Sequence, residues 1–285
     1  MYNILYTILL FNILVIIFKL FGKYRVDNLQ ALIINYLTAA VCASLYFDKE
    51  YHLLQIINSE WIFHAIIIGT LFIIVFNFYA IGIQKIGISI STLTSKISLI
   101  IPVTAAFILY PEKNNFNITT GAAITLAIIG IYLSLTKSGK ISFDKKYLWL
   151  IILIFTGQGF SDLVFNDFAQ NYSNGVGYLF FFILFISASI SGSIILITRL
   201  IKGKAKLQTK SIVWGIIFGI PNFFSLVYFL KALELKESVI VLPIISMGIV
   251  ISSSIIGSII YKEEISRNNW IGISFSIFAI YILSL

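Results

Sequence analysis

The sequence has one cysteine, Cys42, and two histidines, His52 and His64, in 285 residues. A lone cysteine excludes a disulfide within the chain, and Cys42 is interpreted as a small packing residue in an apolar run. No cluster of cysteines or carboxylates accompanies the histidines, so we expect no metal centre and no bound cofactor. No Walker A motif or glycine-rich phosphate loop occurs, which excludes ATP-driven transport encoded by this chain alone.

Charge is also scarce, because only 11% of the residues are charged while 59% are hydrophobic and the mean hydropathy is +0.99. A soluble domain has about a quarter of its residues charged, so this composition predicts a protein dissolved in lipid. Backbone groups in lipid must be satisfied within the segment, and the apolar runs are too long and continuous for barrel strands of about ten residues. The expected fold class is therefore an all-α integral membrane protein.

Ten apolar segments, each near the ~20 residues that cross a bilayer, follow one another with short connections. They cover residues 2–21, 31–47, 61–82, 89–110, 117–136, 147–168, 176–200, 211–232, 238–261 and 269–285. The first has no basic leader and no small-residue cleavage site, so we expect it to be retained. No separate domain outside the membrane is expected.

The net charge of +8 does not indicate nucleic-acid binding, because the basic residues lie in short loops. Fifteen of the 20 fall in the odd-numbered loops and four in the even-numbered loops, while Lys96 lies within a segment. Basic loops stay in the cytoplasm, so this bias predicts that both termini lie outside.

The second half of the chain repeats the pattern of the first. A long run, an acidic residue and a glycine nine positions later occur twice, with Glu112 and Gly121 in one copy and Glu263 and Gly272 in the other. The predicted repeats are residues 1–136 and 147–285, joined by a basic linker. Because each has five segments, the second must enter the membrane from the opposite side, which makes the repeats inverted.

This doubled pattern resembles the EamA family of the drug/metabolite transporter superfamily, over nearly the whole chain. Its acidic break reads Tyr110-Pro111-Glu112 and Tyr261-Lys262-Glu263, which keeps the family's glutamate but not its glycine, and Pro102 and Pro243 lie within the fourth and ninth segments. The resemblance implies a ten-helix carrier of small metabolites in the bacterial cytoplasmic membrane, often an exporter of amino acids or related solutes. It also implies a cavity lined by segments 1, 3, 4, 6, 8 and 9, and termini inside, opposite to the charge bias.

Lys96 lies in the middle of the fourth segment, where an ammonium costs at least ~2.5–3.5 kcal/mol unless it faces a cavity or a partner. Thr92 and Ser95 make the same segment polar, although small hydroxyl residues also serve close helix packing. Asp162 in the sixth segment, near Gln158, is the candidate partner. A static ion pair, a substrate site and a proton-carrying carboxyl, which burial favours in its neutral form, all stay open.

Asn77 and Asn222 fall in corresponding segments, the third and the eighth, and amides there either bridge helices or bind substrate. Tyr79 and Tyr228 are candidates for an aromatic cavity wall, and Ser246 lies near the notch that Pro243 opens. His64 is interpreted as an isolated histidine, and Asp167, near a segment end, as an interfacial residue.

These residues predict a secondary transporter, an exporter by resemblance, that binds a small-molecule substrate within the bilayer, with protons as a candidate coupling ion. No nucleophile, acid–base pair or metal set lies at matching depth, so no enzymatic activity is expected. A non-transporting membrane scaffold and an intramembrane enzyme remain the alternative functions.

Overall fold

The computed structural model describes residues 2–46, 56–86, 88–112, 118–135, 145–174, 176–261 and 266–284. Regular structure within these ranges is helical throughout. The helices are α1 (Tyr2–Lys23), α2 (Asn28–Ser44), α4 (Ile62–Lys85), α5 (Ile88–Ile97), α6 (Ile100–Leu109), α7 (Ile118–Leu135), the 3₁₀ turn η1 (Lys145–Tyr147), α8 (Leu148–Asn171), α9 (Gly177–Ile201), α10 (Thr209–Leu235), α11 (Ser238–Tyr261) and α12 (Arg267–Ser284). Most of the predicted linker and the break at Glu263 lie outside the described residues.

Within the described ranges, six helical stretches are long and apolar enough to cross a membrane. They are residues 2–23, 62–83, 91–109, 148–171, 177–201 and 209–235. The chain is thus a helical, multi-pass membrane protein by length and composition, as the hydropathy predicts. Ten spans and an inverted repeat remain predictions.

The predicted fourth segment, residues 89–110, differs from expectation because it consists of two helices, α5 and α6. At the junction the Leu99 N–H donates to Lys96 O at 3.3 Å, and the Ile101 N–H donates to Ser98 O at 3.0 Å. Pro102 has no N–H to donate to the Ser98 carbonyl, four residues earlier, so the regular pattern cannot run through this point. The junction lies just after Lys96 and places that residue in the last turn of a short helix.

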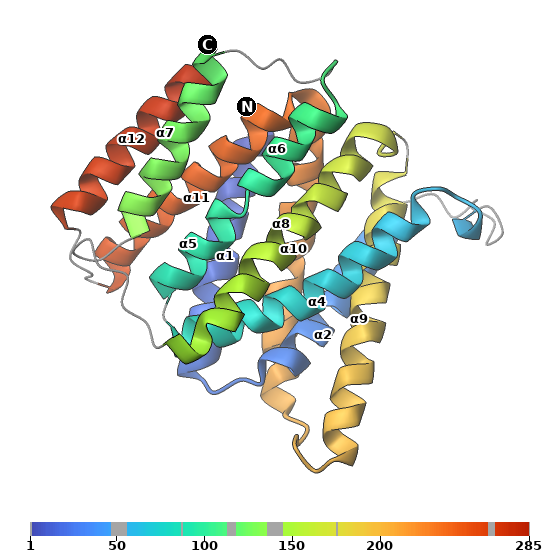
Figure 1. Cartoon of the computed structure of the whole chain (residues 1–285). Coiled ribbons are helices and arrows are strands. Elements are labelled where there is room, and N and C mark those ends of the chain that lie inside the picture. Colours follow the sequence, from blue (N-terminus) through green and yellow to red (C-terminus); the bar gives the residue numbers. More distant parts are fainter. Residues whose placement is uncertain are drawn as a thin grey trace.

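Figure 1 shows α7 and α12 side by side at one edge of the bundle and α9 at the opposite edge, with both termini on the upper side. The helix pairings recur in the two parts of the chain: α2 packs on α10 as α4 packs on α9, and α1 packs on α10 as α8 packs on α4. The contact of α1 with α11 corresponds to the contacts of α8 with α5 and α6. The contact of α11 with α12 corresponds to that of α5 with α7. The two halves are therefore interleaved and do not form separate lobes.

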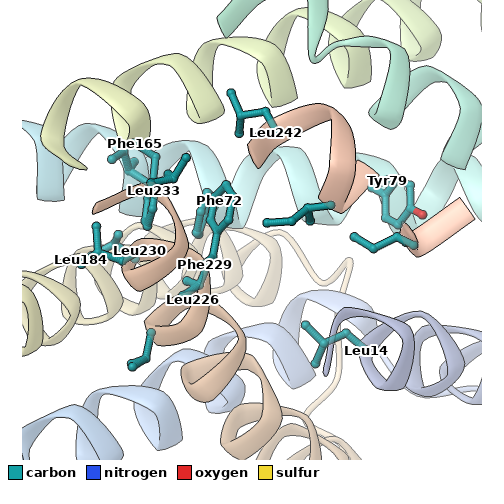
Figure 2. Close-up of a cluster of buried hydrophobic side chains, with 14 of the residues drawn as sticks. Leu14, Phe72, Tyr79, Phe165, Leu184, Leu226, Phe229, Leu230, Leu233 and Leu242 are labelled. Atoms are coloured by element: carbon teal, nitrogen blue, oxygen red, sulfur yellow. The ribbon is translucent and has the colours of Figure 1, made fainter. Parts of the chain in front are cut away.

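The core lies where helices from both parts of the chain meet, as Figure 2 shows. Phe165 of α8 stacks on Phe229 of α10, with ring centroids 5.2 Å apart. Phe72 of α4 and Leu184 of α9 belong to the same buried cluster. Offset aromatic contacts of this kind fix the positions of facing helices in addition to filling space.

Glycines permit the closest helix contacts. A Cβ added to Gly69 of α4 would lie 2.3 Å from the Leu184 carbonyl oxygen of α9, and one added to Gly219 of α10 would lie 2.7 Å from the Asn35 carbonyl oxygen of α2. Small residues at helix interfaces allow backbones in a bilayer to approach closely. The two contacts occupy equivalent interfaces in the recurring pairings.

We expect Gly69→Ala to lower the stability of the purified protein, because the new methyl group meets backbone atoms that cannot rotate away. Overpacking typically costs about 1–3 kcal/mol. The matched control is Gly22→Ala, where nothing lies within 4 Å of the added Cβ. The readout is the thermal midpoint in detergent, measured by size-exclusion chromatography. Equal midpoints for the two variants would contradict the close approach of α4 and α9.

Candidate functional site

Lys96 and Asp162, the predicted ionisable pair, come from α5 and α8 and act on each other electrostatically in the interior of the bundle. Both side chains are half-buried. The Lys96 Nζ lies 5.5 Å from the centroid of the Phe11 ring of α1, within the range of a cation–π contact. The ammonium thus lies near an aromatic ring and interacts with the charge of a carboxylate, and both offset part of the cost of a charge at membrane depth.

Gln158 completes this group, because its Nε2 donates to Asp162 Oδ1 at 2.9 Å from one turn earlier on α8. The glycines beside it admit neighbouring side chains: a Cβ on Gly157 would meet Val75 of α4, and one on Gly159 would meet Ile101 of α6. The α8 surface around Asp162 therefore packs against α4 and α6. The amide holds the carboxylate in place and leaves its second oxygen for another partner.

Other predicted site residues have structural partners. The Tyr79 hydroxyl of α4 lies 3.0 Å from Thr92 Oγ1 of α5, and both side chains are buried. The Ser95 carbonyl accepts from the Ser98 hydroxyl at 2.7 Å, next to the junction of α5 and α6. The first contact joins α5 to α4, and the second lies beside Lys96 at the end of α5.

Four further candidates make no hydrogen bond or ion pair with Lys96 or Asp162 among the described residues. Asn222 Nδ2 donates to Asn35 Oδ1 of α2 at 3.0 Å, a buried amide bridge between helices. Tyr228 lies against Tyr6 of α1, with ring centroids 4.9 Å apart. Ser246 of α11 is half-buried. Asn77 of α4 is also half-buried, and within the described part of the chain no hydrogen bond of its side chain is found.

The structure adds a polar contact that the sequence did not single out. Asn12 Nδ2 of α1 donates to Ser252 Oγ of α11 at 2.7 Å, while its Oδ1 is buried without a partner among the described residues. Asn12 directly follows Phe11, which packs on Lys96. The amide of Asn12 within the apolar first segment could have indicated this contact in the sequence.

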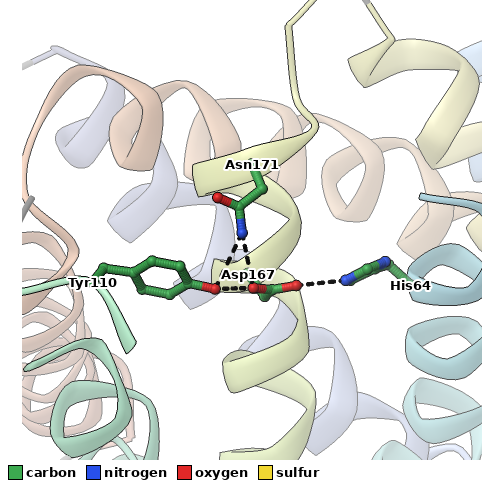
Figure 3. A network of polar contacts seen from close by, with 4 residues as sticks. All are labelled: His64, Tyr110, Asp167 and Asn171. Carbon is green, nitrogen blue, oxygen red and sulfur yellow. Dashed lines mark hydrogen bonds and ion pairs between the residues drawn. The ribbon is translucent and has the colours of Figure 1, made fainter. Parts of the chain in front are cut away.

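A second polar group forms between the start of α4, the end of α6 and the end of α8, as Figure 3 shows. His64 Nε2 lies 2.6 Å from Asp167 Oδ2, and the Tyr110 hydroxyl donates to Asp167 Oδ1. Asn171 Nδ2 donates to the same Oδ1 at 3.0 Å and to the Tyr110 hydroxyl oxygen at 3.2 Å. The interpretation of His64 as an isolated histidine was wrong, because its partner lies 103 residues further along the chain.

A pocket of about 250 Å³ adjoins this network. His64 and Asp167 line it together with apolar side chains from α4, α6 and α8, namely Phe63, Ile67, Leu109 and Leu163. The described residues contain no group of three or more metal-ligating side chains. The pocket is thus an apolar recess bordered on one side by the hydrogen bond between His64 and Asp167.

The fold and the interior charges define a helical membrane protein with an ionisable interior, and the comparisons agree with the fold. No family model matches the chain. An uncharacterized protein of Haemophilus influenzae is 28% identical over 291 residues, covering 99% of this chain and 97% of that protein. A solved crystal structure with no named activity superposes with a TM-score of 0.74 at 13% identity, covering 98% of this chain and 94% of the other.

Proposed function

We propose that this chain is a secondary transporter of the EamA type, which exports a small metabolite such as an amino acid or a related solute across the bacterial cytoplasmic membrane. The observation that carries the proposal is the group formed by Lys96, Asp162, Gln158 and Phe11 in the interior of the helical bundle. Ionisable groups are expensive at membrane depth and mark substrate or ion pathways.

The architecture supports the same proposal. All ten segments would span, as two inverted repeats of five, and the recurring helix pairings are those expected when two such repeats interleave. The charged pair then has one member in each repeat, at a shared central site. Rocking of the two halves about this site would expose it to each side in turn, and Asp162 is the candidate carrier of a coupled proton.

A comparison of the small solutes inside cells and in the medium tests this function without a known substrate. Cells that produce the protein are expected to accumulate at least one small solute in the medium, relative to cells that produce the Lys96→Ala/Asp162→Ala variant at equal membrane level. A scaffold would leave both profiles alike, and an enzyme would change the identity of a compound without requiring its movement.

The charge bias further predicts that both termini face the outside. A phosphatase fused after Leu285 is expected to be active in intact cells, because that enzyme works only once exported, while a fluorescent protein at the same position should stay dark. The reverse result would place the termini in the cytoplasm, as in the family that the sequence resembles.

A further inference from the structure

The network of His64, Tyr110, Asp167 and Asn171 connects the two halves of the chain. His64 and Tyr110 belong to the first predicted repeat, whereas Asp167 and Asn171 belong to the second. Every hydrogen bond of the network except that between Asn171 and Asp167 therefore crosses between the halves. Three helix ends, those of α4, α6 and α8, are held together by one carboxylate (Figure 3).

The corresponding helix ends at the other side of the bundle are joined differently. There the end of α1 meets the start of α10, the pair equivalent to α8 and α4 in the recurring pairings. Trp214 stacks on Tyr24 with centroids 5.3 Å apart, and Lys210 Nζ donates to Tyr24 O at 2.9 Å. Nearby, Gln30 Nε2 donates to Lys206 O at 2.9 Å. This end is closed by aromatic stacking and main-chain contacts.

The network around Asp167 is the more easily opened of the two. It depends on a few hydrogen bonds to one carboxylate, and the apolar pocket adjoins it. His64 Nδ1 is buried and has no hydrogen-bond partner among the described residues, so hydrogen bonding holds the histidine only through Nε2. The His64 ring also packs against the Tyr172 ring, with centroids 5.0 Å apart. Hydrogen bonds to a charged group contribute more than neutral ones, and each can be lost at once when the helix ends separate.

We propose that these four side chains are a latch that closes this end of the central site, and that the latch opens when the two halves move apart. The proposal rests on the alternating-access function proposed above. The carboxylate acts as the shared acceptor, with donors from α4 and α6 reaching across to α8. In the structure described here the latch is closed, and its opening requires the loss of contacts that a single substitution can remove.

Cysteine accessibility measures the latch without requiring a known substrate. Replacing Cys42 by Ser gives a background without cysteine, and Leu163→Cys then places a reporter in the pocket, one turn before Asp167 on α8. A membrane-impermeant maleimide is applied to intact cells and to inverted vesicles, so that the result is independent of orientation. Asp167→Asn or His64→Gln is expected to raise the labelling rate about tenfold, the factor that corresponds to loss of one charge-assisted bond.

Three further variants sharpen the test. The double variant is expected to label no faster than the faster single variant, because both changes break the same contact. Tyr110→Phe removes only a hydroxyl and should also raise labelling, which keeps the test valid if a charge change prevents folding. Glu234→Gln alters an exposed carboxylate outside the network and should label like the parent.

The latch is overturned if Asp167→Asn, His64→Gln and Tyr110→Phe are all folded and all label at the parent rate. Solute efflux from the same cells separates this failure from failure of the proposed function. Faster labelling in the variants, with no efflux from the parent, would support a moving latch in a protein that is not an exporter. Efflux from the parent, with unchanged labelling in the variants, would support transport and reject the latch.

Discussion

Lys96→Ala is expected to reduce the yield of folded protein sharply, and the addition of Asp162→Ala is expected to restore it. The single change leaves the Asp162 carboxylate in the interior with Gln158 as its only hydrogen-bond partner among the described residues. Removing one of two opposite charges in the interior leaves the other uncompensated, whereas removing both relieves the uncompensated charge. The readout is the monodisperse fraction after extraction in mild detergent.

The control for loss of a lysine is Lys85→Ala, because Lys85 is exposed at the end of α4 and its removal should leave the yield unchanged. The double variant should fold but should not transport, since the interior group that meets the substrate is gone. An anionic substrate would depend mainly on Lys96 and a cationic one on Asp162. Single variants that fold and transport like the parent would remove both residues from the site.

The second large effect is a complete block of transport when either end of the bundle is held shut. In the background lacking Cys42, Tyr110→Cys with Asn171→Cys would bridge the latch end, and Tyr24→Cys with Trp214→Cys would bridge the opposite end. A short cleavable bismaleimide is expected to stop net flux in both cases, because alternating access requires each end to open in turn. Cleaving the reagent should restore flux.

Each double-cysteine protein also removes native contacts, so its flux before crosslinking is the proper reference. The corresponding single-cysteine proteins, treated with the same reagent, control for modification alone. Flux that persists with both ends bridged, each in its own protein, would exclude rocking between two access states.

Much of the fold could be predicted from the sequence because lipid imposes a simple rule on the backbone. Long apolar runs must be helices when no water is present to satisfy their N–H and C=O groups. The division of residues 89–110 into α5 and α6 was missed, since hydropathy does not report a break in hydrogen bonding within a uniformly apolar run. Pro102 was the available signal, and its consequence for the Ser98 carbonyl could have been derived.

The candidate site was predicted only in part. Lys96 and Asp162 could be proposed as partners in advance because charge at membrane depth needs compensation. In the described part of the chain their charges influence each other, but the two side chains form no salt bridge or hydrogen bond, and the Asp162 carboxylate bonds to Gln158. The partner of Asn222 could not be found, because Asn35 lies 187 residues away and nothing in the local pattern links them. The contact between His64 and Asp167 could not be predicted for the same reason, because it depends on how α4 packs on α8.

Flux through the purified protein in liposomes is the direct test of whether this chain transports a solute and needs Lys96 and Asp162 to do so. Vesicles are loaded with the solute that the efflux comparison identifies, and its release is followed for the parent, for the Lys96→Ala/Asp162→Ala variant and for protein-free vesicles. We expect saturable release that depends on the parent protein and falls to the protein-free rate in the variant. Release from the folded variant at the parent rate, or from the parent at the protein-free rate, would contradict this expectation.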